Sequence, residues 1–220
     1  MAKLIWDARG EHLYETGTDH GVIYPINAEG SYTTGVVWNG LTSVSESPEG
    51  ADVTDLWADN IKYASIRATE TFKATIEAYT YPDEFALCDG SAELVPGVLI
   101  GQQPRKSFGF SYRTKIGNEI LFDEYGYKLH IIYGASVSPS EKSYETINDS
   151  PSAITFSWEM DTVPVDVVGF KPTASLVVDS TKVDADKMAA LEAVLYGSDS
   201  EEARLPLPDE IANILGDQSN

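Results

Sequence analysis

Cysteine is almost absent from this sequence, because Cys88 is the only one among 220 residues. A single cysteine excludes an intrachain disulfide and a cysteine-based metal cluster. No histidine or lysine stands beside Cys88 to stabilise a thiolate, so we expect a buried, inert thiol. The histidines His12, His20 and His130 are far apart in the sequence and suggest no common ligand set. We therefore expect no metal and no cofactor.

Long hydrophobic runs are also missing. Residues 1–7 lack the apolar stretch of a signal peptide, and no segment approaches the length of a membrane span. We therefore expect synthesis and folding in a cytoplasm, and no membrane partner.

The motifs of the common catalytic sites are absent. The sequence has no Gly-x-Ser-x-Gly elbow, no phosphate loop and no His-Glu-x-x-His pattern. A glycosidase would need one pair of carboxylates across a groove, and the candidates for such a pair are Glu77, Asp83, Glu84, Glu159 and Asp161. Among 35 acidic residues, however, close pairs arise by chance, and nothing in the sequence marks one pair. We expect a protein that is not an enzyme.

Basic residues are scarce, since 15 Lys and Arg stand against 35 Asp and Glu, for a net charge of −20. Affinity for nucleic acid comes mainly from cations that displace counterions from phosphates. A surface this acidic repels DNA and could only form a wall around it. Solubility of an abundant protein explains the same charge equally well.

What the sequence has is a series of segments in which apolar and polar residues alternate. One-faced alternation is typical of antiparallel sheets, because parallel strands are covered on both sides. The apolar faces are Phe72, Ala74, Ile76 and Ala78; Phe108, Phe110, Tyr112 and Ile116; Tyr127, Leu129, Ile131 and Tyr133; and Ile154, Phe156, Trp158 and Met160.

The chain divides into three parts by pattern. Residues 1–35 are aromatic and turn-rich without long periodicity, and we expect an N-terminal arm. Residues 36–197 carry the strands, an acidic loop at 45–60 and one substantial helix at 184–196, capped by Asp184 and ended by Gly197. Residues 198–220 form a C-terminal extension with a short helix. The expected fold is mainly β, an antiparallel β-sandwich or partial barrel with one flanking α-helix.

Several segments together resemble the major tail proteins of long, non-contractile-tailed bacteriophages, and they run from the first part of the chain nearly to its end. They are residues 15–25, 58–63, 77–85, 101–106, 126–130, 147–151, 169–172 and 204–209.

The resemblance implies a tail-tube subunit of the virion. Six copies would close into a ring whose sheets join into one β-barrel, and stacked rings would form a hollow tube. The implied partners are further copies of the chain, a tape measure protein inside the tube, and the tail terminator and tail tip proteins. Viral DNA would pass through without specific binding.

Two sets of residues are candidates for this role. Large apolar side chains in segments without a periodic face are expected at subunit interfaces; these are Tyr14, Tyr24, Leu56, Trp57, Leu205 and Leu207. Carboxylates on polar strand faces, namely Glu77, Glu159 and Asp161, are expected to give the lumen a negative potential, and the outside of the tube is the alternative position for them. Lys73, Arg113 and Lys115 lie on comparable faces, so the expected wall is mixed in sign.

Two other classes fit the sequence. One is a phage tail terminator or another protein that forms a single ring. The other is a carbohydrate-binding β-sandwich, for which Trp38, Trp57 and Tyr79 would supply a row of exposed aromatic rings.

Overall fold

The computed structural model describes residues 4–147, 149 and 152–216. Residues 1–3 of the expected arm, 217–220 of the expected extension, and 148, 150 and 151 of the segment 147–151 lie outside the described residues. The elements in chain order are β1 (Tyr14–Pro25), β2 (Val36–Trp38), β3 (Leu41–Glu46), β4 (Glu49–Gly50), β5 (Val53–Ala58), β6 (Ile61–Arg67), β7 (Glu70–Thr71), β8 (Lys73–Ala78), the 3-10 helix η1 (Asp83–Leu87), β9 (Ala92–Val95), β10 (Val98–Ile100), β11 (Phe108–Asn118), β12 (Phe122–Val137), β13 (Phe156–Thr162), β14 (Ser175–Asp179), α1 (Ala185–Tyr196) and α2 (Pro208–Leu215).

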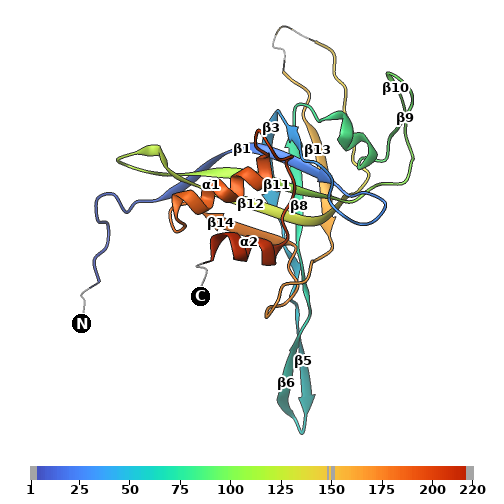
Figure 1. Cartoon of the computed structure of the whole chain (residues 1–220). Coiled ribbons are helices and arrows are strands. Elements are labelled where there is room, and N and C mark those ends of the chain that lie inside the picture. The colour runs from blue at the N-terminus through green and yellow to red at the C-terminus, as the bar shows by residue number, and fades with distance from the viewer. Residues whose placement is uncertain (1–3, 148, 150–151, 217–220) are drawn as a thin grey trace.

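Eight of the described strands form one antiparallel sheet in the order β2-β1-β11-β12-β13-β8-β3, with β14 paired to β12. The sheet bends into two layers (Figure 1). The first layer contains β2, β1, β11, β12 and β14, and the second contains β13, β8 and β3. The mainly β, antiparallel prediction is confirmed. The described strands of one chain do not close into a barrel.

The inner core fills the space between the two layers. Its centre is a cluster of rings in which Trp38 lies 4.5 Å from Phe85 and 5.5 Å from Trp158, centroid to centroid. The alternation predicted for three strands is confirmed here, because Ile76 of β8, Phe110 of β11 and Trp158 of β13 are all fully buried. Alternation works as a signal in β8 and β13 because their other faces meet solvent.

A second core, the helix-side core, lies between the first layer and the helices α1 and α2. Leu129, Ile131 and Tyr133 of β12 pack there against Leu191 and Leu195 of α1. The helix predicted at 184–196 is confirmed, and the Asp184 carboxylate accepts a hydrogen bond from the Asp186 backbone N–H at 2.9 Å. The expectation of one flanking helix is wrong, because α2 buries its Ile211 in the same core. The helix α2 is amphipathic but only eight residues long, so the sequence pattern did not predict that it packs on the sheet.

Gly134 is the point where β12 passes from one layer to the other. On β11 the step from Phe108 to Phe110 is two residues, but their partners on β12, Ala135 and Ile132, are three apart. This β-bulge shifts the alternation, so that Tyr133 enters the helix-side core while both Ile132 and Ala135 face the inner core. Beyond it, β12 pairs with β13. Gly134 has φ +57°, and a Cβ there would lie 2.3 Å from the Val163 carbonyl oxygen.

The structure differs from the expected arm at residues 1–35. Tyr14–Pro25 is the strand β1, which pairs with β11 in the middle of the first layer. Ile23 faces the inner core, and its neighbours Val22 and Tyr24 face the helix-side core. Because both faces of β1 are buried at this end, its sequence shows a continuous apolar run instead of alternation.

We predict that Gly134→Ala lowers the free energy of unfolding by about 3 kcal/mol. About 1 kcal/mol comes from placing alanine at a positive φ and the rest from the contact with Val163. Gly17→Ala is the matched control, since Gly17 has φ +67° but no atom lies within 4 Å of the position that a Cβ would take there. Its expected loss is about 1 kcal/mol. Denaturant titration measures both, and equal losses would show that the bulge does not constrain the layers.

Candidate assembly surfaces

The outward face of the second layer is polar and is covered by no other described element. It is formed by alternate residues of three strands: Ser43 and Ser45 of β3, Lys73, Thr75 and Glu77 of β8, and Ser157, Glu159 and Asp161 of β13. We call these eight residues the outer face. All three carboxylates predicted to face a lumen lie on it together. Arg113 and Lys115 do not, because they lie on β11 in the first layer.

The charges of the outer face are partly paired. Lys73 Nζ lies 3.0 Å from a Glu49 carboxylate oxygen and 3.2 Å from one of Asp161, and these contacts raise the pKa of Lys73. The Ser43 hydroxyl donates to Glu77 at 2.8 Å. With one cation and three carboxylates, the outer face carries net negative charge. It holds hydroxyls and charges but no large apolar side chain.

The hairpin β5–β6 projects away from the two-layered body (Figure 1). Its large apolar side chains have no core to enter: Trp57 is 69% exposed and Tyr63 is 72% exposed. An isolated two-stranded hairpin is at best marginally stable in water. Large exposed apolar side chains commonly mark contact sites for another protein. The hairpin is therefore the strongest candidate for an assembly contact.

The predicted interface residues separate into two groups in the structure. Tyr24 is fully buried and Leu205 is 5% exposed, and both belong to the helix-side core, out of reach of another subunit. The Tyr24 hydroxyl donates to the Leu195 carbonyl at 2.8 Å. The others are at the surface, namely Tyr14, Leu56, Trp57 and Leu207. Only Leu56 and Trp57 lie on the hairpin.

Sequence reasoning assigned residues 45–60 to a loop and so missed half of the hairpin. The turn is formed by Asp59 and Asn60, which both have positive φ, at 53° and 63°. Two such residues in succession make the type I′ turn that suits a two-residue hairpin. Asp-Asn is a weaker signal for this turn than Asn-Gly or Asp-Gly. The strands pair from Val53 with Arg67 to Ala58 with Ile61, with one register shift between Leu56 and Trp57.

The aromatic row of a carbohydrate-binding face is not formed. Trp38 is 2% exposed and belongs to the inner core, where its indole N–H donates to the Thr80 carbonyl at 2.8 Å. Trp57 and Tyr79 are exposed, but Trp57 lies on the projecting hairpin and Tyr79 just after β8. The three rings therefore do not share a surface.

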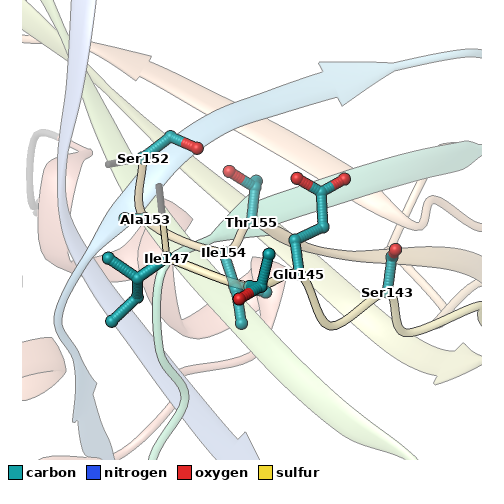
Figure 2. Close-up of a pocket in the computed structure, with 8 residues that line it drawn as sticks. Ser143, Glu145, Ile147, Ser152, Ala153, Ile154 and Thr155 are labelled. Carbon is teal, nitrogen blue, oxygen red and sulfur yellow. The ribbon is translucent and has the colours of Figure 1, made fainter. Parts of the chain in front are cut away.

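One cavity of about 510 Å³ lies within the connection between β12 and β13 (Figure 2). Its lining residues all come from this connection: Ser143, Glu145, Thr146, Ile147, Ser152, Ala153, Ile154 and Thr155. Glu145 is the one ionisable side chain among them. The cavity brings together no acid, base and nucleophile from separate elements.

The residues considered for chemistry are dispersed. Cys88 is fully buried in the inner core, and burial raises the pKa of its thiol to about 12. The His130 ring stacks on the Tyr112 ring, with 4.5 Å between their centroids, and His130 Nδ1 lies 3.4 Å from a Glu46 carboxylate oxygen. His130 and the Tyr112 hydroxyl, which donates to Glu46, lower the pKa of Glu46. Within residues 4–147, 149 and 152–216, no three His, Cys, Asp or Glu side chains gather as metal ligands would.

In the same part of the chain, no helix has the length and apolar character needed to cross a membrane.

No protein-family model and no curated protein matches the chain. Among solved structures, it overlaps with a chain from the cryo-EM structure of the anti-feeding prophage (AFP) baseplate, 6-fold symmetrised. The TM-score is 0.36 and the identity 6%, over 81% of this chain and 97% of that chain. A TM-score this low supports no inference about the function of the present chain.

We predict that the hairpin contributes nothing to the stability of the body. The double substitution Trp57→Ser/Tyr63→Ser should change the free energy of unfolding by no more than about 0.5 kcal/mol, because both side chains are exposed. Trp158→Phe is the contrasting variant: it opens space in the inner core and removes a hydrogen bond to Asp89, at a cost of about 3 kcal/mol. Thermal and denaturant unfolding measure both. A large loss in the hairpin variant would show that these side chains pack on the body.

Proposed function

We propose that the chain is a tail-tube subunit of a long, non-contractile-tailed bacteriophage. In this proposal six copies form a ring, the rings stack into a hollow tube, and viral DNA passes through it from the capsid to the host cell. The observation that carries the proposal is the projecting hairpin β5–β6, which exposes large apolar side chains outside a body that has already completed both of its cores. The eight segments that resemble tail-tube proteins support it.

The charge distribution also supports a conduit. A wall of net negative charge repels phosphates and lets DNA slide, whereas a basic wall would hold it. The outer face would provide such a wall, because it presents hydroxyls and three carboxylates beside the single cation Lys73. We propose that this face lines the lumen. The same lumen would hold the tape measure protein before DNA passes, and the tube ends would meet the terminator and tip proteins.

The proposed role needs no catalysis, metal or cofactor, because conducting DNA requires shape and charge and no bond-making. It places the protein in the virion tail after synthesis in the host cytoplasm. A tail terminator would form a ring that does not stack into a tube. A carbohydrate-binding module would form neither rings nor tubes.

We predict that the purified protein forms tubes in negative-stain electron microscopy and that tube formation requires the hairpin. Residues 54–66 should be replaced by a short Asn-Gly turn, which keeps Arg67 and the pairing of Glu49 with Thr71 and of Gly50 with Glu70 at the hairpin base. Deleting residues 47–57 instead would remove that base as well. The shortened protein should fold with unchanged stability and form no tubes, because inter-subunit burial of the hairpin is lost.

The control for this experiment is a loop of similar exposure. Residues 94–99, in the β9–β10 hairpin, are replaced by the same turn, and this variant should still assemble in part. Normal tubes from the variant without β5–β6 would contradict the role of that hairpin. Lone rings from the full chain would favour a terminator, and monomers that bind glycan would favour a carbohydrate-binding module.

We predict that Glu77→Lys/Asp161→Lys allows assembly but slows genome ejection, because two cations per subunit would then attract the phosphates that pass. The measurement is the rate of DNA release from virions that carry the variant. Glu29→Lys/Glu124→Lys makes the same change of charge at exposed sites away from the outer face and should leave the rate unchanged. Equal rates in all three proteins would place the outer face away from the DNA path.

A further inference from the structure

A groove at the base of the β5–β6 hairpin concentrates positive charge in an acidic protein. Its cavity of about 660 Å³ is lined by Arg67 and Lys171, with Phe72 and Pro164 among its apolar walls and Glu70 as its one carboxylate. The groove combines apolar surface with two cations that approach from separate segments, at the end of β6 and before β14. We call it the basic groove.

The two cations of the basic groove belong to the minority of basic residues in this chain that have no described carboxylate within 4 Å. Elsewhere, Lys62, Lys128 and Arg204 each lie beside an acidic side chain. Because acidic residues outnumber basic ones by 35 to 15, most surface cations of this chain are expected to have a carboxylate nearby. Arg67 and Lys171 are both exposed and so are open to a carboxylate from outside the chain.

The connection between α1 and α2 presents the opposite charge in a preformed turn. The Ser198 N–H donates to the Glu201 carbonyl at 2.9 Å, and the Ser198 hydroxyl accepts from the N–H groups of Ser200 and Glu201 at 3.3 and 3.2 Å. Asp199 and Glu201 are exposed on this turn. We call residues 198–202 the acidic turn.

The acidic turn and the basic groove lie on different sides of the body. In Figure 1 the connection between α1 and α2 lies near the top of the body, whereas the β5–β6 hairpin and its base leave the body at the bottom. The Ala203 carbonyl next to the acidic turn accepts a hydrogen bond from the Gly35 N–H, far from the hairpin along the chain. One chain therefore cannot bring its own turn into its own groove. Two complementary surfaces on opposite sides of one molecule make a head-to-tail contact, which repeats without closing and generates a filament.

We propose that the acidic turn of one copy of this chain docks in the basic groove of the next copy along the tube axis. Asp199 and Glu201 pair with Arg67 and Lys171, while the walls formed by Phe72 and Pro164 exclude water around the contact. The proposal rests on the proposed function in taking a second copy as the partner. It names the surfaces that stack one ring on another and makes the stacking sensitive to salt, since exposed charges are screened over about 8 Å at physiological ionic strength.

Two charge-reversed proteins test the contact. The groove variant carries Arg67→Glu/Lys171→Glu, and the turn variant carries Asp199→Lys/Glu201→Lys. Each alone should yield at least about tenfold less sedimentable tube than the unaltered protein, because like charges now meet at every contact. An equimolar mixture should recover assembly. In the mixture, the acidic turn of the groove variant meets the native groove of the turn variant, and the basic turn of the turn variant meets the acidic groove of the groove variant.

The control separates this contact from an effect of net charge. Arg9→Glu/Lys106→Glu makes the same charge change as the groove variant at exposed residues outside the groove and should assemble normally. If the groove and turn variants each form tubes as the unaltered protein does, the docking proposal is overturned while the tail-tube function stands. If the unaltered protein forms no tubes, the function fails. Sedimentation velocity of the mixture at low salt then decides the docking proposal: complexes larger than either variant alone support it, and unchanged monomers overturn it.

Discussion

The β-bulge at Gly134 holds the two layers of the sheet and both cores in one arrangement. Before the bulge, β12 pairs with β11 and β14 in the first layer, and after it β12 pairs with β13 in the second. One strand thus belongs to both layers, and its side chains enter both the inner core and the helix-side core. The Cβ of any other residue at this position would clash with the Val163 carbonyl oxygen, so the fold requires glycine here.

This arrangement decides which surfaces remain for assembly. The central part of the first layer is buried on both faces, by the inner core on one side and by α1 and α2 on the other. The second layer is buried on one face only, and the outer face remains exposed with its hydroxyls and carboxylates. The β5–β6 hairpin lies outside both cores, so its exposed apolar side chains can gain burial only from another molecule. A rigid body with one polar sheet face and projecting segments suits a subunit that assembles without changing its own fold.

The sequence predicted those elements whose two faces differ in environment. The strands β8 and β13 and the helix α1 were foreseen because alternation and capping residues mark them. The strand β11 was foreseen because Phe108, Phe110 and Tyr112 alternate with small or polar residues, although both of its faces are buried there. The strand β1 was not, because Val22, Ile23 and Tyr24 are buried in succession in two different cores and leave no alternation.

Tyr24 and Leu205 look like interface residues in sequence because their burial depends on helices that are distant along the chain. The three acidic residues of the outer face were grouped correctly, since strand period alone places Glu77, Glu159 and Asp161 on the face opposite the inner core. The basic groove depends on the tertiary meeting of Arg67 and Lys171, which no local pattern encodes.

The most direct test of the proposed role is a cryo-EM reconstruction of the assembled protein that resolves the direction of the second layer. We predict a hollow tube in which the outer face of β3, β8 and β13 lines the channel, with α1 and α2 on the opposite side of the first layer and the β5–β6 hairpin buried against another subunit. A tube in which the helices line the channel, or one in which the hairpin remains in solvent, would contradict this arrangement.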